Sequence, residues 1–246
     1  MISIRICAII PTYNNPETLR DVVLRVKTHI PEIIIINDAS SAVTHDLCNA
    51  LAHEGIARVH HRVINGGKGA AVKDGLTIAA YEGFTHALQI DADGQHETHD
   101  IPHFLHAAQT GPYAMILGAP HFDSTAPKSR LWGRQISIFW THLETGSTAI
   151  TDPMCGFRIY PIHAALRVAS NCGNRMDFDN AILVRMLWNR TPVINIPTRV
   201  RYLTASEGGV SHFRAVRDNI HISWMHTRLV ITRIVHLVLG VFHRGT

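Results

Sequence analysis

The sequence predicts an α/β fold with a mainly parallel sheet that is flanked by helices. Apolar runs of strand length alternate with helical patterns through residues 4–90, an order typical of parallel sheets with right-handed crossovers. The runs are apolar without alternation, as expected for strands that are covered on both faces. With 246 residues, 46% of them hydrophobic and 17% charged, the chain fits one large globular domain, or one domain with an appendage.

Four strands are expected in this region, at residues 4–10, 32–37, 57–61 and 85–90. Helices are expected at residues 16–28 and 44–53, and a third runs from the glycine-rich stretch 65–71 to about Tyr81. The first strand ends at the turn Pro11-Thr12-Tyr13-Asn14 and the second at Asp38. Ligands of open α/β sheets bind at the carboxyl ends of the strands, so both ends are candidate binding positions.

Two carboxylates follow the fourth strand, in the stretch Asp91-Ala92-Asp93-Gly94-Gln95. Side chains two residues apart on an extended chain point the same way, so Asp91 and Asp93 can face one cation, and Gln95 adds a neutral oxygen on that side. Carboxylate and amide oxygens suit Mg²⁺ or Mn²⁺, which keep positions for substrate phosphates. A solvated turn is the alternative for such a pair taken alone.

The glycine-rich stretch Asn65-Gly66-Gly67-Lys68-Gly69 opens a helix. A P-loop is excluded because Lys68 is followed by Gly69 and not by Ser or Thr, and a dinucleotide fingerprint would follow the first strand instead of the third. Lys68 at a helix N-terminus could contact an anion, and a plain tight turn is the alternative.

The charge of the chain is uneven. The net charge is +4, but nine arginines face only two acids, Glu207 and Asp218, from Arg185 onward. A basic end of this kind can meet anionic lipid, nucleic acid or substrate phosphates. No nucleic-acid recognition motif accompanies the charge, so nucleic acid is the least supported partner.

The sequence predicts a cytoplasmic protein, at most peripheral on the inner face of a membrane. No apolar run approaches the ~18 residues that a spanning helix needs, and the N-terminal apolar run is broken too early, at Pro11, for a signal peptide. The four cysteines show no Cys-x-x-Cys spacing, which argues against a zinc site or a redox pair and favours reduced thiols.

Four motifs occur in order along the first half of the chain: Pro11-Thr12-Tyr13-Asn14, Ile36–Ser40, Gly67–Ala71 and Asp91–His96. Together they resemble the family 2 glycosyltransferases, in particular the branch similar to dolichol-phosphate-mannose synthase. The stretch Asp152–Arg158 resembles the acceptor-side motif of that group. Further stretches resemble a bacterial subgroup of the family, at residues 176–185, 197–200, 209–213 and 224–229. The resemblance extends over nearly the whole chain.

The resemblance implies a GT-A fold, a Rossmann-like and mainly parallel sheet flanked by helices. Residues 1–110 would form the nucleotide-sugar half and residues 111–218 the acceptor half of one domain, followed by a basic amphipathic helix at residues 219–246. Asp91, Asp93 and Gln95 would hold Mg²⁺ or Mn²⁺. The substrate-binding residues that it implies are Pro11, Thr12, Tyr13, Asn14, Asp38, Lys68, Asp91, Ala92, Arg130, Arg134 and Arg158. The first five would contact the base and ribose, and the basic residues the phosphates.

The catalytic residues depend on the acceptor. An inverting transferase uses an acceptor-side carboxylate to take the proton of a hydroxyl acceptor, and Asp152 is the first candidate, with a turn-capping role as the alternative. A lipid phosphate would need no base. Relatives tend to carry Glu where this chain has Ala181, so Asp177 or Asp179 would have to substitute, and Asp179 is the second catalytic candidate.

The C-terminal stretch from Asn219 to Arg244 predicts an amphipathic, basic helix. Its polar side would carry Asn219, Ser223, His226, Arg233 and Arg244, and its apolar side Ile222, Met225, Leu229, Ile234, Val238 and Val241. Such a helix can lie in a membrane interface or pack on its own domain.

The sequence therefore predicts an inverting, metal-dependent glycosyltransferase. It would move a sugar from a nucleotide-diphospho-sugar to a lipid-linked or other hydroxyl or phosphate acceptor, and an anionic membrane surface is a further expected partner. A nucleotidyltransferase is the rival enzyme, but it would carry a glycine-rich Arg/Lys signature where Pro11-Thr12-Tyr13-Asn14 stands. A catalytically weak sugar-nucleotide-binding protein is the rival of another class, because of Ala181.

Overall fold

The structure is a computed structural model that describes residues 3–122, 126, 128–202 and 214–240. These residues form a seven-stranded sheet in the order β3-β2-β1-β4-β6-β5-β7. The strands are β1 (Ile6–Thr12), β2 (Ile33–Asn37), β3 (Arg58–His61), β4 (His86–Gln89), β5 (Met115–Phe122), β6 (Arg158–Pro161) and β7 (Val193–Val200). All neighbours pair in parallel except β6, which is antiparallel to both β4 and β5. The predicted mainly parallel α/β sheet is confirmed.

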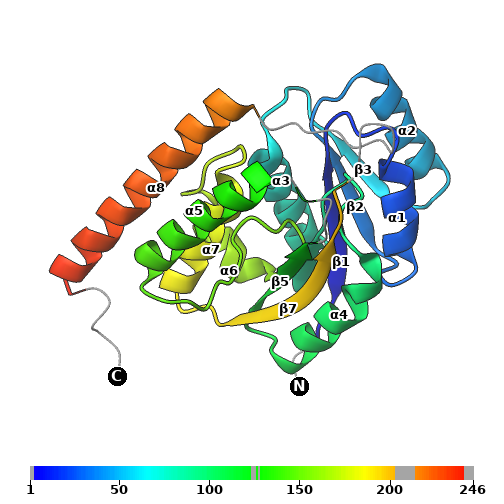
Figure 1. Ribbon diagram of the computed structural model, residues 1–246. Coiled ribbons are helices and arrows are strands. Elements are labelled where there is room, and N and C mark those ends of the chain that lie inside the picture. Colours follow the sequence, from blue (N-terminus) through cyan, green and yellow to red (C-terminus); the bar gives the residue numbers. More distant parts are fainter. Residues whose placement is uncertain (1–2, 123–125, 127, 203–213, 241–246) are drawn as a thin grey trace.

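Helices cover both faces of the sheet (Figure 1). They are α1 (Leu19–Lys27), α2 (Ala42–His53), α3 (Lys68–Tyr81), α4 (Ile101–Thr110), α5 (Lys128–Thr145), α6 (Ile162–Ala169), α7 (Phe178–Trp188) and α8 (Ala215–Val238), with a short 3₁₀ turn at Thr98–Asp100. One core joins α1, α2 and α4 to the sheet, and the other joins α3, α6, α7 and α8 to its opposite face. The sheet therefore divides two hydrophobic cores.

The apolar runs become central strands because they are covered on both sides. Every residue of β2 and of β4 is buried, which agrees with runs that show no alternation. Helix α1 buries Leu19, Val22, Val23 and Val26, the i, i+3, i+4, i+7 pattern of a helix that packs with one face. The four cysteines are buried and unpaired, as predicted.

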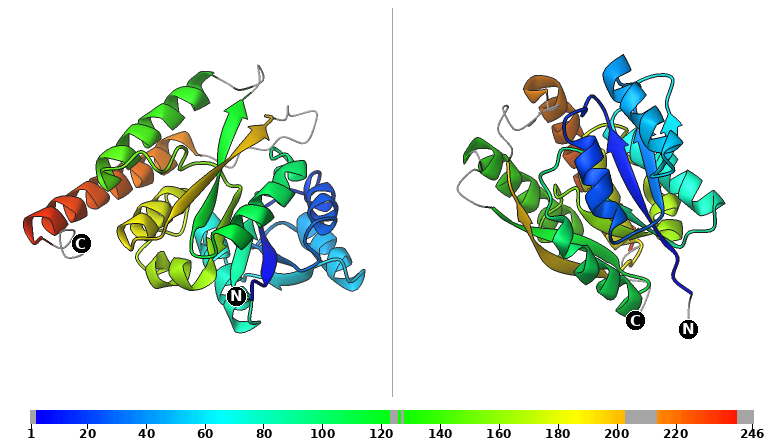
Figure 2. Two further views of the ribbon diagram at one scale, coloured as in Figure 1. Left: turned by 90° about the horizontal axis from the view of Figure 1, so that it is seen from below. Right: turned by 90° about the vertical axis from the view of Figure 1, so that its right-hand side faces the viewer.

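Helix α8 lies beside α5 at the end of the molecule away from α1 and α2 (Figures 1 and 2). It begins at Ala215, so the predicted domain boundary after residue 218 falls inside the helix. Met225 and Leu229 are buried against the domain, so the alternative of a packed helix holds for this side.

The predicted division of α8 into a polar and an apolar side is wrong. His226, expected on the polar side, is 5% exposed and lies 2.5 Å from Glu144 of α5. Ile234 and Val238, expected on the apolar side, are exposed. The reason is that α5 offers a buried carboxylate to the inner side of α8, while apolar residues also occupy the outer side.

Candidate active site

The predicted site residues converge on one edge of the sheet because β1, β2 and β4 are parallel and end together. Thr12 ends β1 and Asn37 ends β2, while Asp91 follows β4 by two residues. Strand β6 is reversed, so its first residue, Arg158, lies at this same edge and pairs with Gln89. The loop that precedes β6, with Asp152, therefore reaches the site from the other direction.

The turn after β1 is hydrogen-bonded to the turn after β2. Asn14 adopts a left-handed backbone conformation with a φ of 53°. Its backbone N–H donates to Ser40 Oγ over 3.0 Å, and its side-chain Oδ1 accepts from the Ser41 N–H over 2.8 Å. Thr12 is buried and Tyr13 is half-buried. Of the predicted base-binding residues, Pro11 and Thr12 thus lie inside the sheet, and Tyr13 and Asn14 form its rim.

Asp38 holds the glycine-rich loop in place. Its two carboxylate oxygens accept from the backbone N–H groups of Gly66 and Gly67 over 2.9 and 2.7 Å, and Arg62 Nη1 donates to the first of them over 2.5 Å. Gly67 has a φ of 95°, a conformation open mainly to glycine. Asp38 is 3% exposed, and both of its carboxylate oxygens contact the glycine-rich loop. Its predicted contact with a base or ribose stays a prediction.

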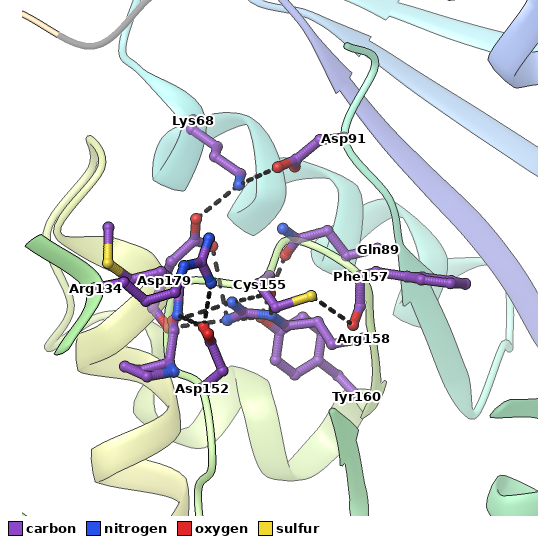
Figure 3. Close-up of polar contacts among 12 residues, drawn as sticks. Lys68, Gln89, Asp91, Arg134, Asp152, Cys155, Phe157, Arg158, Tyr160 and Asp179 are labelled. Carbon is purple, nitrogen blue, oxygen red and sulfur yellow. Dashed lines mark hydrogen bonds and ion pairs between the residues drawn. The ribbon is translucent and has the colours of Figure 1, made fainter. Parts of the chain in front are cut away.

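Lys68 is the centre of the site (Figure 3). Its Nζ lies 2.8 Å from Asp91 Oδ2 and 2.6 Å from Asp179 Oδ2, so one ammonium joins the end of β4 to the start of α7. Burial would lower the pKa of Lys68, but the carboxylates of Asp179 and Asp91 outweigh it and raise that pKa. Burial would likewise raise the pKa of Asp91, yet Lys68 brings it below its ordinary value.

Asp93 stands beside this ion pair. Burial, together with the negative charge of Asp91, raises its pKa to about 6, because two nearby carboxylates resist ionising together. Its Oδ1 accepts from the Gln95 N–H over 3.0 Å, which fixes the turn that carries both predicted ligands. The backbone of Ala92 is fixed as well, since its carbonyl accepts from Thr18 Oγ1 over 2.6 Å.

The residues at this turn fit a hard divalent cation. Asp91 Oδ1 is buried and has no hydrogen-bond partner among the described residues, and a Cβ on Gly156 would lie 2.0 Å from Asp91 Oδ2, so only glycine leaves room for that carboxylate. Within the described ranges no group of three or more His, Cys, Asp or Glu side chains is arranged as a metal cage. Two carboxylates and an amide would suit an ion that takes few protein ligands and shares its shell with phosphates, and their role as ligands stays a prediction.

Arg158 is placed differently from the prediction that it binds substrate. It is fully buried, and its guanidinium donates to the carbonyls of Cys155, Pro153 and Asp179 and to the hydroxyl of Tyr160. Tyr160 in turn donates to Gln89 Oε1 over 3.2 Å. A second bond to the Cys155 carbonyl, from Nη2, uses the last of the five N–H groups of the guanidinium. No donor is left for a ligand, so Arg158 supports the loop before β6 and the start of α7.

Arg134 and Asp152 form a second ion pair in the site. Arg134 Nη1 lies 2.5 Å from Asp152 Oδ1, and both side chains are largely buried. The same oxygen accepts from the Met154 N–H over 2.8 Å. The guanidinium of Arg134 also lies over the Phe122 ring at 4.7 Å, and that of Arg130 over the Tyr202 ring at 5.0 Å. Both predicted arginines of α5 therefore lie beside the end of β5.

Asp179 contacts Lys68 with Oδ2, one of the two oxygens of its carboxylate. Its Oδ1 has no hydrogen-bond partner among the described residues and lies 3.7 Å from Arg158 Nη1. Ala181 is 3% exposed and belongs to the core on the α3, α6, α7 side. Asp179, the second catalytic candidate from the sequence, is thus in contact with Lys68.

Several residues of the site carry no signal in the sequence. His96 looks like one of three surface histidines with His99 and His103, yet it is 8% exposed and packs against Phe157, with ring centroids 5.6 Å apart. Burial lowers the pKa of His96 to about 4, against the attraction of Asp91, so it is neutral near pH 7. Arg62, Gln89 and Tyr160 were missed because each acts through a partner far away in sequence. The motif at residues 209–213 lies outside the described residues.

No helix in the described part of the chain is long and apolar enough to cross a membrane. Residues 7–171 match the family described as Glycosyl transferase family 2. Among curated relatives, the undecaprenyl-phosphate mannosyltransferase of Micrococcus luteus is 28% identical over 163 residues, covering 63% of this chain and 66% of that protein. The polyprenol monophosphomannose synthase of Mycolicibacterium smegmatis is 31% identical over 136 residues, covering 54% of this chain and 51% of that protein.

The chain thus spans between half and two thirds of the length of these two relatives. Among solved structures, glucosyl-3-phosphoglycerate synthase of Mycobacterium tuberculosis, in complex with Mn²⁺ and uridine-diphosphate-glucose, superposes with a TM-score of 0.66 at 15% identity, over 93% of this chain and 78% of that one. That likeness concerns the fold, which is GT-A. The family match extends over more than half of the sequence and includes strands β2 to β6, the glycine-rich loop, Asp91, Asp93 and Asp152, and the chain belongs to glycosyltransferase family 2.

Proposed function

We propose that this protein transfers a sugar from a nucleotide-diphospho-sugar to a lipid-linked phosphate, with inversion and with Mg²⁺ or Mn²⁺. The observation that carries the proposal is the position of Lys68, whose ammonium bridges Asp91 on the donor side and Asp179 on the acceptor side. One fixed positive charge between the two halves of the site suits a reaction in which a diphosphate leaves and a phosphate attacks.

On the donor side, the turn at Tyr13 and Asn14 would receive the base and ribose. Asp91, Asp93 and Gln95 would hold the metal, which supplies charge neutralisation for the leaving diphosphate when it is bound. Lys68 lies at the N-terminus of α3, where the helix dipole and the free backbone N–H groups also favour an anion. Together these groups would orient the diphosphate and exclude water from its neighbourhood.

On the acceptor side, the contacts of Asp152 favour a phosphate over a hydroxyl acceptor. Asp152 Oδ1 accepts from Arg134 and from the Met154 N–H, so Asp152 holds in place an arginine that can bind a phosphate. Arg130 and Arg134 are one helical turn apart on α5 and can bind a phosphate, Arg134 by a fork of two hydrogen bonds.

Transfer to a lipid phosphate requires no general base. An ionised oxygen of the lipid phosphate attacks the anomeric carbon from the face opposite the leaving group, the bond from that carbon to the diphosphate oxygen breaks, and its electron pair leaves with the diphosphate. A single displacement inverts the anomeric configuration. The sugar phosphodiester forms with no proton to remove.

Two relatives support this acceptor class, since one is an undecaprenyl-phosphate mannosyltransferase and the other a polyprenol monophosphomannose synthase. A lipid-linked acceptor would bring the protein to a membrane surface as a peripheral protein, on the cytoplasmic side that the sequence predicts. A hydroxyl acceptor is the second candidate. Asp179 favours it, because its Oδ1 has no hydrogen-bond partner among the described residues and could accept a proton.

The test has two steps. Thermal unfolding with UDP-, GDP- and TDP-sugars, each with Mn²⁺ or Mg²⁺, should identify the donor, because a ligand at ~100 Kd adds about 2.7 kcal/mol to the unfolding free energy. Transfer of radiolabelled sugar is then measured to a polyprenyl phosphate and to the matching polyprenol. Transfer to the phosphate alone is expected, and transfer to the alcohol alone would overturn the acceptor assignment.

The metal assignment is tested with the same assay. Asp93→Asn keeps the size of the side chain and its contact with Gln95 but removes a charge, so it should abolish the stabilisation that Mn²⁺ adds to donor binding. Asp46→Asn, a change of an exposed carboxylate on α2, is the matched control and should behave like the parent. Undiminished Mn²⁺-dependent donor binding in Asp93→Asn would refute the metal site.

A further inference from the structure

Helix α8 has an apolar outer face, opposite to the side that packs on the domain. Val216, Ile220, Trp224, Ile231, Val235 and Val238 are between 45% and 80% exposed. Their spacing places them on one stripe of the helix, and α8 runs along the outer edge of the molecule (Figures 1 and 2). Scattered exposed apolar residues are common, but a stripe of six that includes a tryptophan, interrupted by Thr227, marks a surface that meets a partner.

The charges around this stripe are basic. Arg217 and Arg228 are exposed on α8, whereas the one acid of the helix, Asp218, is 6% exposed and accepts from the Arg214 N–H over 2.7 Å. The neighbouring helix α5 likewise has one acid, Glu144, which is fully buried. Two copies of this basic face would repel each other, so the charge pattern favours an anionic surface as the partner.

A pocket of about 260 Å³ opens beside the stripe. Arg175 and Asp177 line it from the loop before α7, Arg185 lines it from α7, and Trp224 and Arg228 line it from α8. Trp224 therefore belongs to the stripe and to the pocket. The pocket is separate from the carboxylates that contact Lys68.

The three arginines of the pocket lack counter-charges. Within the described residues none of their guanidinium groups forms an ion pair or a hydrogen bond, and the Nε of Arg185 is buried without a partner. Burial lowers the pKa of Arg185, and the positive charge of Arg228 lowers it further. Asp177 is the one acid of the pocket, and its Oδ1 accepts from the Arg175 backbone N–H over 3.2 Å. An anion in the pocket would relieve this repulsion and fill the free donors.

We propose that this pocket binds the phosphate headgroup of an anionic membrane lipid while the outer stripe of α8 lies among the lipid chains at the membrane interface. The stripe argues for a lipid as the source of the phosphate, because a free phosphate would leave it in water. The proposed function supplies the reason why the protein would meet a membrane, and this inference rests on it to that extent. The pocket is a second lipid site, away from the acceptor phosphate proposed at Arg130 and Arg134.

The experiment measures binding of the full chain to vesicles with no sugar donor present. Vesicles of phosphatidylcholine, with or without phosphatidylglycerol, are sedimented with the parent, Arg228→Gln, Arg217→Gln and Trp224→Ala, and circular dichroism checks the fold of each. Arg217→Gln is the matched control, since it removes the same charge from the same helix outside the pocket. Inorganic phosphate at constant ionic strength is the competitor.

The parent should bind the vesicles that contain phosphatidylglycerol. Loss of one surface charge should weaken binding about fivefold in Arg217→Gln, whereas Arg228→Gln should weaken it by more than about tenfold, because a charged hydrogen bond is lost as well. Trp224→Ala should also reduce binding to both kinds of vesicle. Inorganic phosphate should compete only weakly, because it cannot occupy the stripe.

Three results would overturn the proposal. Equal losses in Arg228→Gln and Arg217→Gln would mean diffuse attraction without a pocket. Tight binding of inorganic phosphate without vesicle binding would mean a free-anion site. Dimers that depend on Trp224 in light scattering, again without vesicle binding, would mean an interface between two copies. Vesicle binding that depends on Arg228, in a protein that transfers no sugar, would keep this inference and refute the proposed function.

Discussion

The ammonium of Lys68 lies 2.6 Å from the carboxylate of Asp179, and this ion pair joins the first turn of α3 to the first turn of α7. The two residues come from opposite halves of the sequence, and Asp91 completes the bridge. A buried cation between two carboxylates is stable only while all three partners remain. The site is thereby tied together by a single side chain.

Replacement of Lys68 by Met should therefore inactivate the protein. The change leaves Asp91 and Asp179 without their shared cation and removes the positive charge between donor and acceptor. We expect turnover to fall by about 10²-fold or more, the usual effect of removing one electrostatic contact in a transition state. Lys73→Met, on the same helix but directed to the Cys172 carbonyl, is the control. Steady-state sugar transfer measures both, and equal losses would contradict the assignment.

Asp152→Asn separates the two acceptor classes. If the acceptor is a phosphate, Asp152 only holds Arg134 in place, and the variant should mainly raise the KM for the acceptor. If a hydroxyl acceptor needs Asp152 as base, kcat should fall by about 10²–10⁴-fold. Initial rates against acceptor concentration distinguish the two. We expect the first result, and an unchanged KM with a strongly reduced kcat would restore Asp152 as the base.

The fold should tolerate removal of the charge of Glu144 but not removal of its hydrogen-bonding side chain, which contacts His226. Burial raises the pKa of Glu144 against the influence of His226, so the fold already favours a neutral side chain there. Glu144→Gln keeps an acceptor for the His226 ring and should change the unfolding free energy by less than about 1 kcal/mol. Glu144→Ala leaves the buried His226 ring without its hydrogen-bond partner and should cost about 1–3 kcal/mol. Urea unfolding compares the two, and similar losses in both would show that the charge itself is needed.

Acid should destabilise the protein partly through His86. Burial lowers the pKa of His86, although its Nε2 lies 2.9 Å from the Pro112 carbonyl. As the pH falls, the His86 side chain is therefore protonated in the unfolded chain before it is protonated in the folded one. The contribution of His86 to the unfolding free energy is fully present above pH ~6.5 and is lost as the pH drops toward the folded pKa, by at most about 1.4 kcal/mol per pH unit. His86→Gln should reduce this slope in urea unfolding between pH 7.5 and 5.5. His53→Gln, at an exposed position, should leave the slope unchanged.

The first half of the fold follows from the sequence because its strands are uninterrupted apolar runs that end in polar turns. The turn at Asp91 and the helix at Lys68 were predicted for the same reason. The reversal of β6 was not, since nothing in the four residues Arg158–Pro161 shows which way the strand runs. The role of Arg158 was therefore misjudged: an arginine beside the acceptor motif suggests a phosphate contact, whereas its acceptors are carbonyls that only the folded chain brings around it.

The contacts of Asp38 and His96 were hidden for a different reason. An acid after a strand predicts a ligand, but the glycine-rich loop lies close enough for its N–H groups to take both oxygens of Asp38. A histidine in a polar stretch predicts a surface position, yet a bridge to Val200 of β7 covers His96. In both cases a contact distant in sequence outweighs the local pattern.

The reversed strand β6 also limits how the chain can vary in length. A loop that follows a strand can grow outward, because only its start is fixed by the sheet. The loop that leads into β6 is held at both ends, by Arg134 at Asp152 and by the pairing of Arg158 with Gln89. One inserted residue there would displace either end by about 3.3 Å. We therefore expect insertions and deletions to accumulate in the connections at the opposite edge of the sheet, while this segment keeps its length.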